Sequence, residues 1–208
     1  FCEQNTRGGI SMISNRYAEA NNKYTDKGFD ETKDKSYITY MDANGLYATI
    51  MRDNKLPTGG FRFWTDDEIR DRYSDFSESK IEKDSDIGYF LEVDLDYPPE
   101  LHDKHNDYPL APEKMTVTDD MRGSDAFTFP DRPKPSEKLV PNLNDKKNYG
   151  LHYENLKLYL KLGMQLKEIH RVLEFKQSAW METYVRLCSQ NRIKANTQFE
   201  KDFWKLCI

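Results

Sequence analysis

Long hydrophobic segments are missing from this sequence of 208 residues. Its apolar runs are much shorter than the ~20 residues that a membrane-spanning helix needs, and its first residues show no leader pattern. Cysteine is scarce, and Cys2, Cys188 and Cys207 are too widely spaced to suggest disulfides, which favours a reducing compartment. We therefore expect a soluble, intracellular protein with no membrane partner. The sequence does not distinguish nucleus, mitochondrion and viral factory.

Two classes of enzyme are excluded by motifs that the sequence lacks. It has neither the Gly-rich phosphate-binding loop of ATPases nor a Ser/His/Asp set for hydrolysis. The net charge of −5 also argues against a protein that coats nucleic acid. A basic cleft within an acidic protein is still allowed, and the mean hydropathy of −0.90 is typical of an open, cleft-forming piece.

Residues 37–51, Tyr-Ile-Thr-Tyr-Met-Asp-Ala-Asn-Gly-Leu-Tyr-Ala-Thr-Ile-Met, are the most informative segment. The pattern predicts a strand that ends at Asp42 and turns directly into a helix. Asp42 would then lie near free backbone N–H groups and near Tyr47, an arrangement that suits a divalent ion and a triphosphate. Taken alone, such an aspartate is more often a helix cap than a metal ligand.

The residues from Ser178 onward predict one or two long helices. Lys194, Lys201 and Lys205 follow one another at spacings of seven and four residues, which predicts a stripe of positive charge on one helical face. Apolar residues would occupy the opposite side: Phe199, Phe203 and Leu206. A solvated lysine face is the alternative to a phosphate-binding one.

Three segments resemble motifs of the B-family DNA polymerases, specifically the protein-primed branch found in bacteriophages, organellar linear plasmids and large DNA transposons. Residues 42–47, Asp-Ala-Asn-Gly-Leu-Tyr, resemble motif A, which reads Asp-x-x-Ser-Leu-Tyr or, in the transposon-like branch, Asp-x-Asn-Asn-Leu-Tyr. Residues 6–9, Thr-Arg-Gly-Gly, are similar to the Tyr-x-Gly-Gly linker that precedes the polymerase part. Residues 205–208 resemble the opening of motif B, Lys-x-x-x-Asn-Ser-x-Tyr-Gly. The resemblance covers essentially the whole chain.

This resemblance implies template-directed addition of deoxynucleotides to a primer 3′-end by two-metal phosphoryl transfer. Asp42 would be the catalytic aspartate and would bind Mg²⁺, with the carbonyl of Ala43 completing its side of the metal site. The backbone N–H groups of Leu46 and Tyr47 would bind the dNTP phosphates. The ring of Tyr47 would pack against the sugar and exclude a 2′-hydroxyl.

The resemblance implies further contacts with dNTP and DNA. Lys201 and Lys205 would bind the triphosphate from the fingers, and Lys194 would assist them unless a one-residue shift exchanges it with Ile193. The linker-like segment would contact the backbone of the DNA template, where glycine permits a close approach: Arg7, Gly8 and Gly9. The implied partners are therefore a DNA template, a DNA primer and dNTP.

The sequence departs from the family pattern at several places. Gly45 stands where Ser or Asn is usual, and Ala48 stands where Pro or Gly is usual. Motif C, Tyr-x-Asp-Thr-Asp, which would carry the second metal-binding aspartate, does not occur in the 208 residues. We therefore expect a polymerase fragment that is inactive alone. The alternative is a catalytically inactive remnant that binds nucleic acid or protein.

The expected fold class is α+β: part of a polymerase palm, with an antiparallel sheet and helices, plus a palm insertion and a helical fingers segment. Residues 1–36 would link the exonuclease and polymerase parts, and residues 37–60 would form the palm segment with motif A. Residues 61–177 would continue the palm and carry the insertion. Residues 178–208 would form the fingers helices that lead into motif B.

Local patterns predict individual elements within these parts. The expected helices and strands are a short helix at 12–21, a helix at 66–73, a strand at 88–95, a helix at 152–162 that Gly163 ends, and a strand at 165–175. Alternation places Tyr89, Leu91, Val93 and Leu95 on one face of the strand at 88–95, and it places Asp94 and Asp96 on the solvent face.

Residues 98–148 hold most of the nine prolines and predict an extended or irregular insertion. In the protein-primed family such an insertion contacts the priming terminal protein, so the resemblance implies that partner. A tolerated surface loop is an equally good interpretation. His102 and His105, within this segment, are interpreted as part of a surface loop and not as a zinc site.

Overall fold

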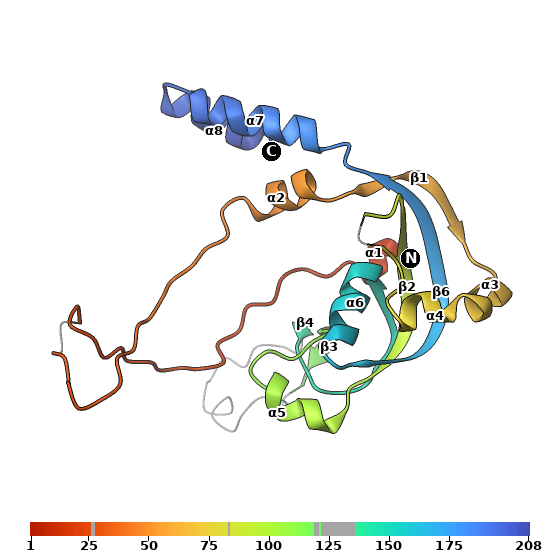
Figure 1. Ribbon diagram of the computed structural model, residues 1–208, viewed down its shortest axis with the longest axis horizontal. Coiled ribbons are helices and arrows are strands. Elements are labelled where there is room, and N and C mark those ends of the chain that lie inside the picture. The colour runs from red at the N-terminus through yellow and green to blue at the C-terminus, as the bar shows by residue number, and fades with distance from the viewer. Residues whose placement is uncertain (26–27, 83, 119–120, 122–135) are drawn as a thin grey trace. The chain divides into compact units, whose positions relative to one another are not determined.

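The computed structural model contains two compact units (Figure 1). The residues that it describes are 1–25, 28–82, 84–118, 121 and 136–208. Unit 1 comprises residues 1–11 and 55–178, and unit 2 comprises residues 12–54 and 179–208. Helices and an antiparallel sheet occur together, so the fold class is α+β, as predicted. None of the described helices is long and apolar enough to cross a membrane.

A four-stranded antiparallel sheet forms the centre of unit 1, with the strand order β1–β6–β2–β5. Its strands are β1 (Leu56–Phe63), β2 (Ile87–Asp96), β5 (Lys146–His152) and β6 (Gln165–Ser178). The long β6 pairs with β1 along one side and with β2 along the other, and Figure 1 shows it curving through the sheet. The predicted strands at 88–95 and 165–175 are confirmed as β2 and β6.

One face of the sheet carries the core of unit 1. Tyr89, Leu91, Val93 and Leu95 of β2 are all buried, which confirms the predicted alternation. Helix α6 (Tyr153–Lys161) contacts β2, β5 and β6 and adds buried side chains to this core. The helix ends just before Gly163, whose φ of +108° lies in the region that favours glycine. The prediction of a helix at 152–162 is therefore confirmed.

Shorter elements complete unit 1. They are α1 (Cys2–Asn5), α3 (Asp66–Asp71), α4 (Tyr73–Ser77), the 3-10 helix η1 (Pro99–Leu101), α5 (His102–His105), β3 (Glu113–Val117) and β4 (Ser136–Val140). A capping box formed by Thr65 and Glu68 begins α3, in agreement with the predicted helix. Strands β3 and β4 pair with each other as a separate two-stranded sheet.

The proline-rich segment is less irregular than predicted. Its described residues include η1, α5, β3 and β4, whereas residues 119–120 and 122–135 lie outside the described part. His105 is not in a surface loop, because its side chain is buried and its Nδ1 lies 2.9 Å from the hydroxyl of Tyr97. That hydroxyl also accepts a hydrogen bond from the backbone N–H of Leu110. The surface-loop interpretation of His105 was therefore wrong.

The described residues of unit 2 contain three helices. They are α2 (Leu46–Asp53), α7 (Glu182–Lys194) and α8 (Gln198–Leu206), and α7 contacts both of the others. The predictions of a helix at 12–21 and of a strand at 37–42 are wrong, because the structure gives neither stretch a helix or strand. No strand among the described residues pairs with residues 37–42, and an unpaired strand would leave its backbone groups without partners.

Candidate functional site

The motif-A-like segment lies in unit 2 and ends in a turn that glycine allows. Gly45 precedes α2 with φ of +58° and ψ of +44°, a left-handed conformation that Gly and Asn adopt most easily. Its carbonyl accepts the first helical hydrogen bond, from the N–H of Thr49 at 2.9 Å. Glycine therefore suits this turn, although it departs from the Ser or Asn of the motif.

The start of α2 exposes several backbone and side-chain groups within a short stretch of chain. Gly45 supplies no side-chain cap, and the N–H groups of Leu46 and Tyr47, in the first turn of α2, have no acceptor within the helix. The side chain of Tyr47 is 83% exposed and that of Leu46 is 54% exposed. Asp42 and Ala43 are exposed as well. Residues 42–47 thus carry an exposed carboxylate, an exposed residue whose carbonyl could bind a ligand, the N–H groups of a helix start and an exposed aromatic ring.

The prediction that the three lysines form a single helical stripe is wrong. Lys194 ends α7, whereas Lys201 and Lys205 belong to α8. A capping box formed by Thr197 and Glu200 begins the second helix, and this Thr-x-x-Glu signal was visible in the sequence. Lys201 and Lys205 do share one face, and all three lysines are exposed.

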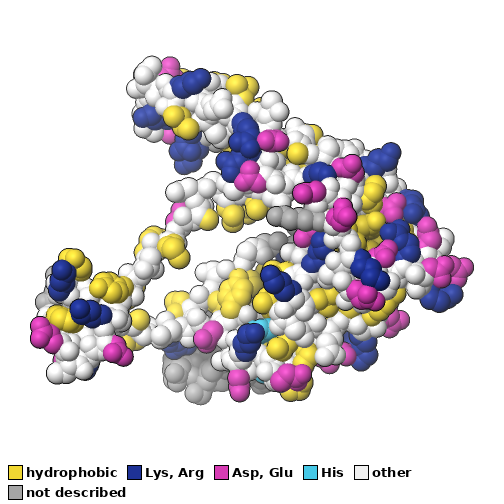
Figure 2. Space-filling model, viewed as in Figure 1, with side chains coloured by type: hydrophobic (Ala, Val, Ile, Leu, Met, Phe, Trp, Pro, Cys, Tyr) yellow, Lys and Arg dark blue, Asp and Glu magenta, His cyan; other side chains and the backbone are white. Residues whose placement is uncertain are grey.

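The apolar side of α8 is exposed instead of packed. Phe199 is 80% exposed, Phe203 is 50% exposed and Leu206 is 86% exposed. Figure 2 shows hydrophobic and basic side chains together on the surface of α7 and α8. Helix α7 holds α8 by other contacts, among them a 2.6 Å hydrogen bond from the Tyr184 hydroxyl to the carbonyl of Cys207.

The linker-like segment belongs to unit 1, where Arg7 is tied to β5. Its Nη1 donates to the carbonyl of Gly150 at 2.6 Å, and its guanidinium lies 3.8 Å from the centre of the Tyr149 ring. Gly8 and Gly9 are exposed, and no atom of the chain lies within 4 Å of the position a Cβ would take. Nothing within the described chain therefore requires glycine at these two positions.

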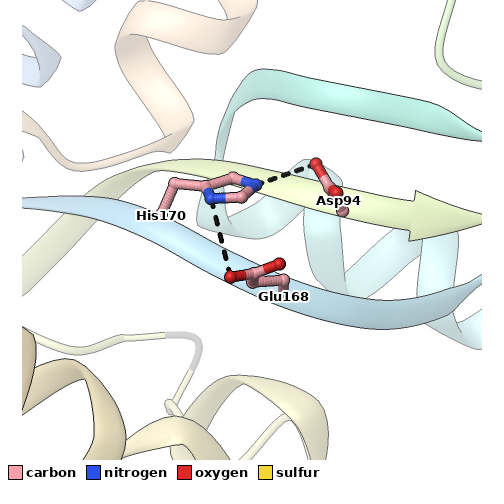
Figure 3. A group of neighbouring side chains, drawn as sticks. All are labelled: Asp94, Glu168 and His170. Atoms are coloured by element: carbon pink, nitrogen blue, oxygen red, sulfur yellow. Dashed lines mark hydrogen bonds and ion pairs between the residues drawn. The ribbon is translucent and has the colours of Figure 1, made fainter.

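A second polar group, not predicted, lies on the sheet of unit 1 (Figure 3). Nε2 of His170 lies 2.8 Å from Oδ1 of Asp94, and its Nδ1 lies 3.9 Å from a carboxylate oxygen of Glu168. The side chain of Asp94 is only 9% exposed, whereas those of His170 and Glu168 are 28% and 64% exposed. The prediction that Asp94 faces solvent was therefore wrong.

Two β-bulges explain how Asp94 becomes buried. Opposite β6, the register passes from Glu92 and Arg171 to Val93 and Ile169, so His170 is the extra residue of a bulge. Opposite β5, the register shifts between Val93 and Leu95, which places both Lys147 and Asn148 beside Asp94. Bulges re-aim side chains that strict alternation would direct elsewhere. Asp94 is thus enclosed by polar groups from both neighbouring strands.

The charges around Asp94 favour its ionised form. Its Oδ2 lies 2.9 Å from the ammonium of Lys147, and its Oδ1 accepts the N–H of Asn148 at 2.8 Å. Burial alone would raise the pKa of Asp94, but the Asn148 N–H, His170 and Lys147 outweigh burial and hold that pKa well below its usual range. The same contact with Asp94 raises the pKa of Lys147.

Asp94, Glu168 and His170 can hold a metal ion, because one ligand atom from each lies within 4.8 Å of the others. No other such group of three ligating side chains occurs among the residues that the structure describes, and Asp42 is not part of it. The strand register brings residues 94 and 168–170 together, so no local sequence signal could have found this group.

Comparisons of the chain with protein-family models, with curated proteins and with solved structures gave no match.

Proposed function

We propose that this chain is part of a protein-primed B-family DNA polymerase and that unit 2 carries elements of its dNTP site. The observation that carries the proposal is the packing of α7 against both α2 and α8. The motif-A-like helix and the lysine-bearing helices are distant in sequence, and a polymerase must bring these same segments together around a dNTP.

The start of α2 supports this assignment chemically. Uncapped N–H groups at a helix start favour anionic ligands such as phosphate. The exposed ring of Tyr47 stands at this same helix start, where it would pack against the sugar of a bound nucleotide. Lys201 and Lys205, exposed on α8, would neutralise the triphosphate charge.

Asp42 and the Ala43 carbonyl offer two oxygen ligands, the kind that Mg²⁺ prefers. One carboxylate and one carbonyl supply part of a two-ion site, and the proposal requires a second aspartate from motif C. When bound, Mg²⁺ would activate the primer 3′-hydroxyl and neutralise phosphate charge. A DNA template, a DNA primer and a priming terminal protein are the partners in this proposal.

Sugar selection by Tyr47 gives the proposal a specific test. The protein encoded by the complete reading frame, with Mg²⁺ and a primed template, should prefer dNTP to rNTP. Tyr47→Ala should lower that preference at least about tenfold, because the ring no longer excludes the 2′-hydroxyl. Tyr40→Ala is the matched control, since Tyr40 is also a highly exposed tyrosine of the same segment.

An unchanged preference in Tyr47→Ala, in a protein that incorporates dNTP, would refute this role for the ring. Failure of the folded wild-type protein to incorporate any nucleotide would refute the polymerase proposal itself. It would leave the alternative of a remnant that binds nucleic acid or protein without chemistry.

A further inference from the structure

The polar group on the sheet of unit 1 has the composition of a transition-metal site. It joins one imidazole to two carboxylates, and imidazole is a preferred ligand of Zn²⁺, Cu²⁺ and Ni²⁺. Mg²⁺ prefers ligand sets made of oxygen alone. The side chains that line this group therefore favour a different ion from the one proposed at Asp42.

We propose that Asp94, Glu168 and His170 form a binding site for a transition-metal ion of the Zn²⁺ class, with three protein ligands and an open coordination position. The inference does not rest on the proposed polymerase function, because all three residues belong to the sheet of unit 1.

The two carboxylates lie beside different nitrogens of the His170 ring, so Glu168 must rotate for all three residues to bind one ion. Bonds of about 2.1 Å in a tetrahedral site place the ligand atoms about 3.4 Å apart, whereas the three atoms now lie within 4.8 Å of one another. Nε2 of His170 lies 2.8 Å from Oδ1 of Asp94. An ion bound between these two atoms needs Nε2 unprotonated, so binding proceeds with the ring proton on Nδ1 and releases any second proton to solvent. Glu168, the most exposed of the three, can rotate to complete the site.

The sheet fixes the positions from which the three ligands reach the ion. Asp94 and Glu168 are register partners on adjacent strands, and His170 is the bulge residue next to them. The backbone N–H of Asn148 holds the Asp94 carboxylate in place. Such a hydrogen bond to a ligand orients it and tunes its affinity for metal.

A groove beside α3 and β6 exposes two of the three proposed ligands, Glu168 and His170, to solvent. The groove has a volume of about 550 Å³ and is lined by both Glu168 and His170, together with Arg70 and Tyr73 of the α3–α4 segment. A fourth ligand, such as water or a small anion, can therefore reach an ion at this position. Three protein ligands with one open position are the arrangement of catalytic zinc sites.

Replacement of Lys147 distinguishes metal binding at this site from nonspecific binding elsewhere. Its ammonium lies 2.9 Å from Oδ2 of Asp94, where it repels a metal ion and competes for the carboxylate. Because its side chain is 58% exposed, Lys147 can be replaced without opening the core. Removal of this charge should strengthen metal binding, whereas removal of a ligand should weaken it.

The test is calorimetric titration of the 208-residue protein with Zn²⁺, in a Cys2→Ser, Cys207→Ser background that removes the two thiols not fully buried. We expect one Zn²⁺ per chain, with binding weakened at least about tenfold by His170→Gln and by Glu168→Gln. Lys147→Gln should tighten binding severalfold. Asp96→Asn is the matched control: it removes a carboxylate of the same strand outside the group and should leave the affinity within about twofold of wild type.

Circular dichroism and thermal unfolding in the presence of EDTA establish first that each variant folds. A folded His170→Gln or Glu168→Gln protein that binds Zn²⁺ as tightly as wild type would overturn the proposal. So would the absence of Zn²⁺ binding by the folded wild-type protein, or equal weakening by Asp96→Asn and Glu168→Gln.

Discussion

Asp94 shows how a single buried charge organises the sheet. Its carboxylate receives the N–H of Asn148 and contacts Lys147 and His170, so each oxygen has a partner from a neighbouring strand. A buried carboxylate with such partners is costly to neutralise, because its loss leaves the partner groups unpaired. Asp94 of β2 thus connects β5 and β6 at the point where both of these strands have a bulge.

We predict that Asp94→Asn destabilises the protein by about 2 kcal/mol in urea unfolding, a value set below that of fully buried pairs because Lys147 is more than half exposed. The measurement is made in EDTA so that no metal contributes. Asp96→Asn should cost less than about 0.5 kcal/mol, since the Asp96 pair with Lys167 is exposed. Equal losses in the two variants would contradict the role given to Asp94.

His152 makes the free energy of unfolding depend on pH. Burial lowers the pKa of His152 to about 4, and its ring packs against Phe90 and Phe175. Its Nδ1 also accepts the N–H of Glu154 at the start of α6, which requires an unprotonated nitrogen. Folding therefore favours neutral His152, and protonation opposes folding.

The direction of the effect follows from linkage. The folded pKa lies below the unfolded value of about 6.5, so this stability is present above pH 6.5 and is lost as the pH falls toward 4. We predict that the His152 contribution to the free energy of unfolding is lower at pH 5 than at pH 8 by about 2 kcal/mol. His152→Asn keeps a capping acceptor and should lack this component. An identical pH profile in the two proteins would rule out the assignment.

At the scale of elements, β2 and β6 pack closely through a glycine. A Cβ at Gly88 would lie 2.3 Å from a ring carbon of Phe175 and 2.6 Å from Oε1 of Gln177. Phe175 is fully buried and Gln177 is 5% exposed, so neither can move aside freely. The approach of the two strands therefore depends on the absence of a side chain.

We predict that Gly88→Ala destabilises unit 1 by about 1–3 kcal/mol, the usual cost of overpacking a core. Gly8→Ala is the control, because nothing lies within 4 Å of its added Cβ, and it should change stability by less than about 0.5 kcal/mol. Both values come from chemical unfolding followed by tryptophan fluorescence. A neutral Gly88→Ala would show that the β2–β6 packing is looser than described.

Elements with strong local patterns could be predicted from the sequence, and elements set by distant partners could not. β2 was predictable because its buried and exposed residues alternate, and α6 because Gly163 ends its periodic pattern. The strand at 37–42 was predicted from the local pattern of residues 37–51, and no strand of the described residues pairs with it. The bulges around Asp94 depend on β5 and β6, so local alternation gave the wrong exposure.

The predicted single lysine stripe is a different kind of error, because the sequence contained a signal for the start of a second helix. Thr197 and Glu200 form a capping box that begins a new helix, whereas the lysine spacing suggested a continuous one. The capping box therefore decided where the second helix begins, and the regular spacing of the lysines did not. Gly45, a departure from the motif, has a left-handed φ that glycine adopts easily, so it suits the turn before α2.

At the scale of the whole molecule, the two proposed sites belong to different compact units. Unit 1 contains the sheet with Asp94, Glu168 and His170, and unit 2 contains Asp42 with the three helices α2, α7 and α8. The acidic net charge of −5 is compatible with a polymerase only if positive charge is concentrated locally, and α7 and α8 carry such residues on their surfaces.

The most direct measurement is nucleotide incorporation by the protein encoded by the complete reading frame, with Mg²⁺ and a primed DNA template. Wild type and the control Asp53→Asn, which alters an exposed carboxylate of α2, should extend the primer. Asp42→Asn should lose extension by at least about a thousandfold, since it removes a ligand of the catalytic ion. Equal extension by Asp42→Asn and wild type, or no extension by a folded wild-type protein that carries motif C, would contradict the proposed function.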